Sequence, residues 1–140
     1  MGFHESTQNA GRERWRTLVE TAQSIPTKYP NQKWTPPDVE AWADYAMEET
    51  SAEQADIGTS NQLVRHTGFV NVNLYFRQGG TAKSPHKYVD DIAVLFRMLT
   101  VTTPGSSDIV FSVPRRSTVG DYQQWYVINL TMPFYSDEVT

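Results

Sequence analysis

The chain offers few residues that could carry out chemistry, and they lack the spacing that catalysis or metal binding requires. Its three histidines, His4, His66 and His86, stand far apart, and no two have the spacing of zinc ligands. Asp90 and Asp91 fall in a helical stretch, where adjacent side chains point about 100° apart and cannot share a proton. The sequence therefore predicts no catalytic residue, no metal site and no cofactor.

Two adjacent glycines, Gly79 and Gly80, follow a predicted strand and precede a predicted helix, as the phosphate loop of a nucleotide-binding protein does. The segment lacks the third glycine and the lysine followed by serine or threonine that such a loop uses. A plain turn is therefore the better interpretation.

Charged clusters are the remaining candidates. Carboxylates gather at Glu48, Glu49, Glu53 and Asp56. Their spacing matches no calcium-binding loop, so we expect residues 49–62 to form an exposed acidic loop. Arg115 and Arg116 lie between two predicted strands, where they could contact a partner or only form part of a solvated loop.

Length and composition favour a single domain over residues 1–140, with flexible ends at 1–11 and 136–140. The net charge of −4 disfavours a nucleic-acid binder, which would need a basic patch. The chain has no cysteine, no apolar run long enough to span a membrane and no signal-peptide pattern. We expect a protein made in the cytoplasm that does not bind membranes.

The first predicted element is a helix with one apolar stripe. The stripe consists of Trp15, Leu18, Val19 and Ala22. We expect Ser6 to cap this helix and Pro26 to end it, while Gly11 weakens its middle. Residues 26–37 contain four prolines and predict an extended connector, which Tyr29 and Trp34 would hold to the core.

Residues 38–56 fit two structures. A helical stripe runs through Val39, Trp42, Ala43, Ala46 and Met47. With a period of two, Ala41, Ala43, Tyr45 and Met47 form one face of a strand. Local propensity alone favours the helix.

The clearest pattern is the strand predicted over residues 63–77. Apolar side chains alternate with polar ones at Val70, Val72, Leu74 and Phe76, which is typical of a half-buried strand. Residues 81–99 then switch to helical periodicity, with Ser84 as the expected cap and Pro85 at the first helical position.

The last part predicts strands over 108–114 and 122–134, joined by a polar connection over 115–121. Apolar residues on one face of the second strand are Tyr126, Ile128, Leu130, Met132 and Phe134. Pro133 indicates that this strand ends there or lies at an edge.

The order of these motifs is similar to that of the tail terminator-like proteins of long-tailed, siphovirus-type bacteriophages. The resemblance covers residues 12–138. It rests on the runs WTPPDVEAWADYAMEE, RHTGFVNVNLYFRQGG, VDDIAVLFRM, VPRRSTVGD and WYVINLTMPFYSDE. None of these runs contains a catalytic signature.

The resemblance implies an α+β fold, with a mixed or antiparallel sheet of about four or five strands and two main helices, in the order α-β-β-α-β-β. It implies that residues 39–50 form a strand, although Asp44, Tyr45 and Ala46 depart from the usual pattern there. Because sheet context can override helical propensity, we adopt the strand.

The resemblance also implies a structural protein rather than an enzyme, located at the head-proximal end of the virion tail. Its subunits would form a ring, usually a hexamer, that ends tube polymerisation and joins the head connector. The partners would be the tail tube protein and the connector, and DNA would pass through the lumen without specific binding. Candidate contacts between subunits or with partners are Tyr29, Trp34, Arg115, Arg116, Trp125 and Tyr135.

Two rival functions remain. Within the same class, the chain could be another head–tail joining or tail-completion ring protein. From a different class, it could be a small ligand-binding or enzymatic α+β domain, which a deep cleft lined by Asp90, Asp91 and His86 would favour.

Overall fold

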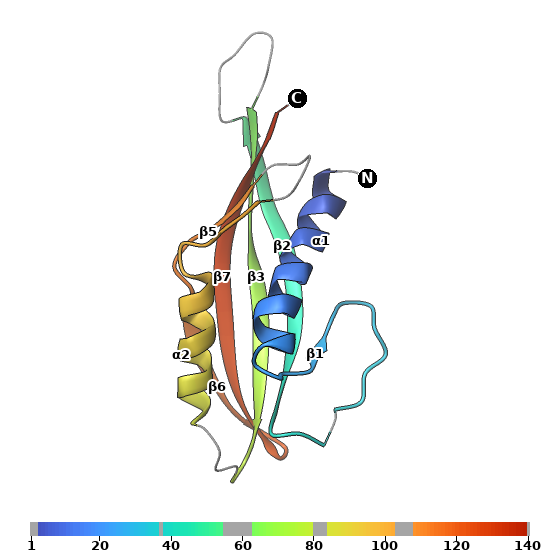
Figure 1. Ribbon diagram of the computed structural model, residues 1–140, viewed down its shortest axis with the longest axis vertical. Helices are drawn as coiled ribbons and strands as arrows, with labels where there is room; N and C mark the ends of the chain where they lie inside the picture. Colours follow the sequence, from blue (N-terminus) through green and yellow to red (C-terminus); the bar gives the residue numbers. More distant parts are fainter. Residues whose placement is uncertain (1–2, 37, 55–62, 80–83, 103–107, 140) are drawn as a thin grey trace.

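Three long antiparallel strands form the centre of the computed structural model, which describes residues 3–36, 38–54, 63–79, 84–102 and 108–139. They are β2 (Ala41–Gln54), β3 (Leu63–Arg77) and β7 (Trp125–Val139). β3 lies in the middle and pairs with β2 on one side and with β7 on the other (Figure 1).

Four shorter strands extend this centre into a seven-stranded mixed sheet. β1 (Thr27–Lys28) pairs in parallel with β2 at one edge. At the other edge, β5 (Ile109–Phe111) and β6 (Arg115–Tyr122) pair with different halves of β7, and β4 (Thr100–Val101) pairs with β5.

The α+β class is confirmed, but the predicted four or five strands and the order α-β-β-α-β-β are wrong. β1 and β4 have only two residues each, too few to show a periodic pattern. The predicted connection over 115–121 is the strand β6. Every residue of β6 except Gly120 is exposed, on both faces of the strand. Its sequence therefore lacks the alternation that marks a half-buried strand.

Two helical segments cover one face of the sheet (Figure 1). α1 (Phe3–Trp15) continues into the π-helical turn η1 (Arg16–Thr21), and α2 (Pro85–Phe96) lies beside it. Pro85 begins α2 as predicted, but Ser84 makes no capping hydrogen bond through its side chain. α1 begins before Ser6, which is therefore not its cap.

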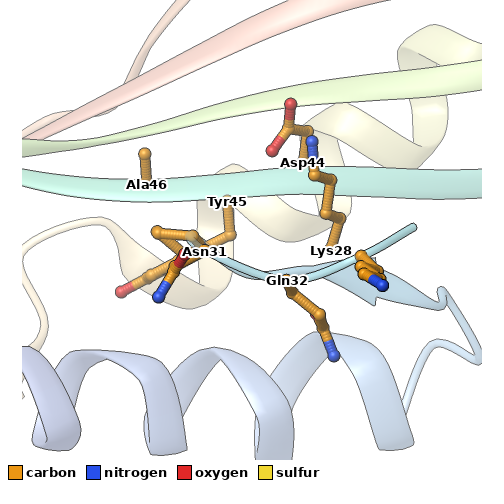
Figure 2. Close-up of a pocket in the computed structure, with 8 residues that line it drawn as sticks. Lys28, Asn31, Gln32, Asp44, Tyr45 and Ala46 are labelled. Carbon is orange, nitrogen blue, oxygen red and sulfur yellow. The ribbon is translucent and has the colours of Figure 1, made fainter.

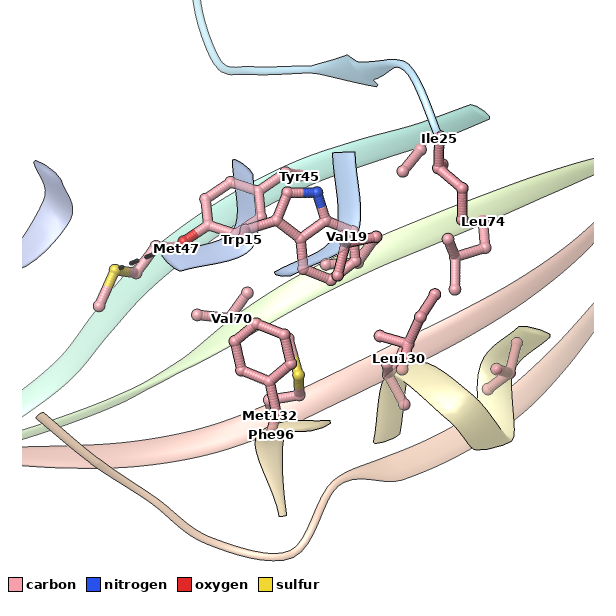
Figure 3. Close-up of a cluster of buried hydrophobic side chains, with 14 of the residues drawn as sticks. Trp15, Val19, Ile25, Tyr45, Met47, Val70, Leu74, Phe96, Leu130 and Met132 are labelled. Carbon is pink, nitrogen blue, oxygen red and sulfur yellow. Dashed lines mark hydrogen bonds between the residues drawn. The ribbon is translucent and has the colours of Figure 1, made fainter. Parts of the chain in front are cut away.

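The core lies between the helices and the covered face of the sheet (Figure 3). From β3 it takes the alternating residues Val70, Val72, Leu74 and Phe76, as predicted. The helices contribute Trp15, Val19, Val89, Ile92 and Phe96. Ala22, which was predicted to lie on the apolar stripe of the first helix, is exposed instead.

The strand adopted for residues 39–50 is confirmed, because β2 pairs with β1 and β3. β2 continues to Gln54, so residues 49–54 belong to a strand instead of the predicted loop, and 55–62 lie outside the described residues. Gly11 lets α1 approach β2 closely, because a Cβ there would lie 2.9 Å from the Met47 sulfur. The glycine that weakens the helix by propensity thus permits its packing.

β7 continues past Pro133 to Val139, so the strand does not end there, and of the two predicted alternatives the local edge position fits better. β6 pairs with β7 as far as Thr131, and β5 begins to pair at Phe134. Pro133 therefore lies between the two neighbours, where its missing N–H costs no ladder bond, and its carbonyl accepts a hydrogen bond from Ser112. Residues 3–11 and 136–139, predicted as parts of flexible ends, belong to α1 and β7.

A single glycine allows β2 and β3 to pair along their full length. Gly68 lies opposite Glu49, where β2 has a bulge before Ser51. A Cβ at position 68 would overlap the Glu48 carbonyl oxygen and lie 2.9 Å from the Glu49 Cα. These are backbone atoms of the paired strand, so they cannot move aside as a side chain could.

We predict that Gly68→Ala lowers the free energy of unfolding by about 3 kcal/mol, the upper end of the range for overpacking. Gly79→Ala is the control, because Gly79 has a φ of 77° but no atom within 4 Å of a Cβ. It should cost only about 1 kcal/mol of backbone strain. Urea unfolding followed by tryptophan fluorescence measures both, and an equal or smaller loss for Gly68→Ala would contradict the close approach.

Candidate functional site

The face of the sheet opposite the helices, here called the outer face, carries a ladder of neutral polar side chains. The Asn129 amide donates hydrogen bonds to the side-chain oxygens of Asn71 (2.8 Å) and Asn73 (2.9 Å). The Thr131 hydroxyl donates to the Asn129 side-chain oxygen at 2.9 Å. The ladder is hydrogen-bonded within the subunit and presents no charge at the centre of this face.

Aromatic rings cover one end of the outer face. Trp42 stacks on Tyr75 with ring centroids 4.0 Å apart, and its edge meets Trp125 at 6.1 Å. Trp34 packs against Trp42 from the connector after β1. Burial, followed by the charge of Asp44, raises the pKa of Tyr75. This aromatic cluster forms a second, smaller core on the face that the helices leave uncovered.

Arg77 closes the aromatic cluster at its margin. Its guanidinium lies 5.2 Å from the centre of the Trp125 ring and donates hydrogen bonds to the Asp38 carboxylate at 2.6 Å and to the Val39 carbonyl at 3.3 Å. The Arg77 guanidinium is therefore paired within the subunit and is not free to bind an anion of a partner or ligand.

Titratable side chains meet at the opposite end of the sheet, next to the C-terminus (Figure 1). His66 on β3 lies between Glu49 on β2 (Nδ1 to Oε1, 2.7 Å) and Glu138 on β7 (Nε2 to Oε1, 3.0 Å). Burial acts to lower the pKa of His66, but the hydrogen bonds to both glutamates and their negative charges outweigh it and raise the pKa. This histidine cluster joins the three central strands.

A second ion pair lies beside the histidine cluster. Arg65 donates two hydrogen bonds to Asp137, at 2.9 and 3.0 Å, and its guanidinium lies 4.3 Å from the centre of the Tyr135 ring. Hydrogen bonding to Arg65 lowers the pKa of Asp137. Across the part of the chain that the structure describes, no group of three or more potential ligands could hold a metal ion.

The two edges of the sheet differ in shape. Along the β1–β2 edge lies a cavity of about 490 Å³, and Figure 2 shows the β2 residues and connector side chains that line it. Its lining consists of Lys28, Pro30, Asn31, Gln32, Lys33, Asp44, Tyr45 and Ala46. Along the other edge, β6 projects exposed side chains, and of its two arginines Arg116 forms an ion pair with Asp90 of α2.

The comparisons with known proteins fit this geometry. One family, described as phage tail terminator protein, matches residues 8–134. The chain belongs to this family. A solved structure that carries only a sequence identifier as its name has a TM-score of 0.68 and is 14% identical, covering 94% of this chain and 95% of its own. No curated protein gives a significant match.

Membership of the tail terminator family makes the protein a structural component of the phage tail. The likeness to the solved structure supports the fold alone, over nearly the whole chain. No helix among the described residues has the length and apolar character needed to cross a bilayer.

The six predicted contact residues of this tail terminator do not come together in one place. Tyr29 and Trp125 are both buried within the subunit, and Tyr29 holds the connector to the core as predicted. Burial and the Glu20 carboxylate raise the pKa of Tyr29 to about 12, and Arg12 and Arg16 lie over its ring. These two rings therefore stabilise the subunit instead of offering surface.

The other four contact residues stay predictions. Trp34 is half-buried in the aromatic cluster, and Tyr135 is half-buried beneath Arg65. Arg116 is held by Asp90. Arg115 is exposed and has no ion-pair partner among the described residues.

The residues expected in an enzymatic cleft serve other purposes. Asp90 pairs with Arg116, Asp91 lies 3.5 Å from the Lys87 ammonium, and the His86 ring meets the edge of Tyr126. The cavity described above is lined by other residues, at the opposite edge of the sheet. Among the described residues, Asp90, Asp91 and His86 therefore do not line this cavity.

The sequence alone does not indicate the histidine cluster. His66 and Glu138 lie 72 residues apart, and only the pairing of β3 with β7 brings them together. The polar ladder does leave a signal, because Asn71 and Asn73, like Asn129 and Thr131, alternate with buried apolar residues.

We predict that His66→Gln lowers the free energy of unfolding more at about pH 6 than at about pH 8.5. The pKa of His66 is higher in the folded protein than the value of about 6.5 in an unfolded chain. Its stabilising contribution is therefore complete below that value and is lost as the pH rises through the folded pKa.

Urea unfolding at both pH values measures the effect. His86→Gln is the matched control, because His86 packs against Tyr126 rather than between two carboxylates. A loss for His66→Gln that is equal at both pH values would contradict the charged cluster.

Proposed function

We propose that this tail terminator forms a ring at the head-proximal end of the tail tube, where it ends tube polymerisation and gives the head connector a surface to join. The observation that carries the proposal is the family match over residues 8–134, which spans α2 and most of the sheet. The partners would be the tail tube protein, the connector and further copies of the subunit.

The subunit is built in a way that suits a closed ring. Ring closure by rotation needs a heterologous interface, in which one surface patch meets a different patch on the neighbour. The sheet offers two different edges, one with a cavity and one with a projecting strand. The number of six subunits rests on the family resemblance.

The charge of the subunit suits a channel for DNA. A net charge of −4 repels phosphates, whereas a basic lumen would hold the duplex by releasing its counterions. The middle of the outer face carries neutral amides and hydroxyls, which have no charge for the backbone to bind. We infer that the genome passes through the ring without specific binding.

Phage that lack this protein test the proposal. We predict tail tubes that are overlong and uneven in length under negative-stain electron microscopy, because nothing would end their polymerisation. The wild-type gene supplied in trans should restore uniform tails that carry heads.

Two other outcomes would overturn the proposal. Normal tails joined to heads would show that the protein is not needed for either step. Tubes of normal length without heads would instead indicate a head–tail joining or tail-completion protein, the rival within the same class.

A further inference from the structure

We propose that neighbouring subunits meet edge to edge, with β6 of one subunit against the β1–β2 edge of the next and Arg115 between Asp44 and Glu48 of that neighbour. The occupant of each edge is thus a second copy of this chain. This inference rests on the proposed ring and specifies the surfaces that close it.

β6 is an exposed edge strand. Seven of its eight residues are exposed, and among the described strands it pairs only with β7. Two of the exposed side chains are large and apolar, Val119 at 62% and Tyr122 at 58%. Proteins normally protect such an edge, because its unpaired backbone groups and apolar side chains favour contact with another chain.

The opposite edge of the sheet is open beyond β1. β1 pairs with β2 only at Ala43 and Asp44, so no described strand lies on the outer side of β2 from Ala46 onward. Gln8 of α1 reaches this edge at one point, where it donates a hydrogen bond to the Met47 carbonyl. The cavity adds a hollow beside Asp44, Tyr45 and Ala46 (Figure 2).

The strand registers place Arg115, Asp44 and Glu48 at about the same level of the sheet. Arg115 lies opposite Thr131, Thr131 opposite Asn71, and Asn71 opposite Ala46. Paired residues in a sheet share a face, so Arg115 is on the outer face at the level of Ala46. Asp44 and Glu48 lie two residues to either side of Ala46, on that same face. Ser117 lies opposite Asn129, Asn129 opposite Asn73 and Asn73 opposite Asp44, so the rest of β6 continues to the level of β1.

Arg115, Asp44 and Glu48 have no ion-pair partner among the described residues. Arg116, next to Arg115, is already paired with Asp90 inside the subunit, whereas Arg115 is exposed. Glu48 is exposed and Asp44 is half-buried. Arg115 on one edge and Glu48 near the same level on the other have opposite charges, which favours a specific register between copies, whereas Asp44 already lies opposite Lys28 of β1.

The remaining charges agree with this arrangement. Lys28 and Lys33 also line the cavity, and β6 carries Asp121 near its far end, so each edge offers both signs. The directions agree as well, because β6 runs antiparallel to β7, β7 to β3 and β3 to β2. In a flat ring, β6 of one copy therefore runs antiparallel to β2 of the next.

Cysteine cross-linking tests this contact directly, because the natural chain contains no cysteine. The variant carries Ala46→Cys on β2 and Ser117→Cys on β6, and a short bifunctional thiol reagent is applied to isolated tails. We expect a ladder of covalent oligomers that stops at the number of subunits in the ring.

Each single variant should stay monomeric, and a mixture of the two single variants should stop at dimers. A double variant that remains monomeric on normally assembled tails would overturn the proposal. Dimers from Ser117→Cys alone would overturn it too, since they would mean that β6 meets β6.

Charge reversal tests the same contact without cysteines. Arg115→Glu should reduce the amount of subunit on tails about tenfold or more, because it sets like charges against each other at the interface. Glu48→Lys combined with Arg115→Glu should restore much of that loss. Arg115→Gln and Arg116→Gln form a matched pair, of which only the first should weaken assembly, because Arg116 is satisfied within its own subunit.

Separate results would overturn the ring function and the edge contact. Normal tails from phage that lack the protein would remove the ring function itself. Full incorporation of Arg115→Glu into tails that need the protein would remove only the edge contact.

Discussion

The structure depends on the pairing of β3 with β2 and β7, because every other element packs on these three strands or extends their edges. β3 is 15 residues long and is paired on both sides, so its backbone hydrogen bonds are satisfied within the sheet. Pairing along this length requires Gly68, where the bulged β2 backbone comes too close for a side chain. The small Gly11 then lets α1 settle on β2, and the core forms beneath both helices.

Covering only one face leaves the protein with surfaces of three kinds. The outer face is closed within the subunit by the hydrogen-bonded ladder around Asn129 and by the aromatic cluster around Trp42. The end near the C-terminus is held by His66 and its two glutamates. The sheet edges differ from these, because β6 and β2 beyond Asp44 are not covered by any described strand. A ring built from such subunits has its natural contacts at those edges.

The sequence predicts the centre of this fold well and its edges poorly. Alternation reveals which side chains of β3 and β7 face the core, because one face of each strand is buried. β2 fits a helical stripe equally well, and only its pairing with β3 decides for a strand. β6 leaves no periodic signal since it buries neither face, and the contact of His66 with Glu138 depends on a register between distant segments.

Amide hydrogen exchange in the free subunit and in assembled tails tests the central claim, that the sheet edges are the assembly surfaces. The account predicts strong slowing on assembly for the amides of β6 (Arg115–Tyr122), of β1 (Thr27–Lys28) and of Ala46, which the strand registers place beside β6 of the neighbour. The amides of β3, already paired on both sides, should change little and serve as the internal reference. Exchange in β6 that is equally fast in the free and assembled protein would contradict the account.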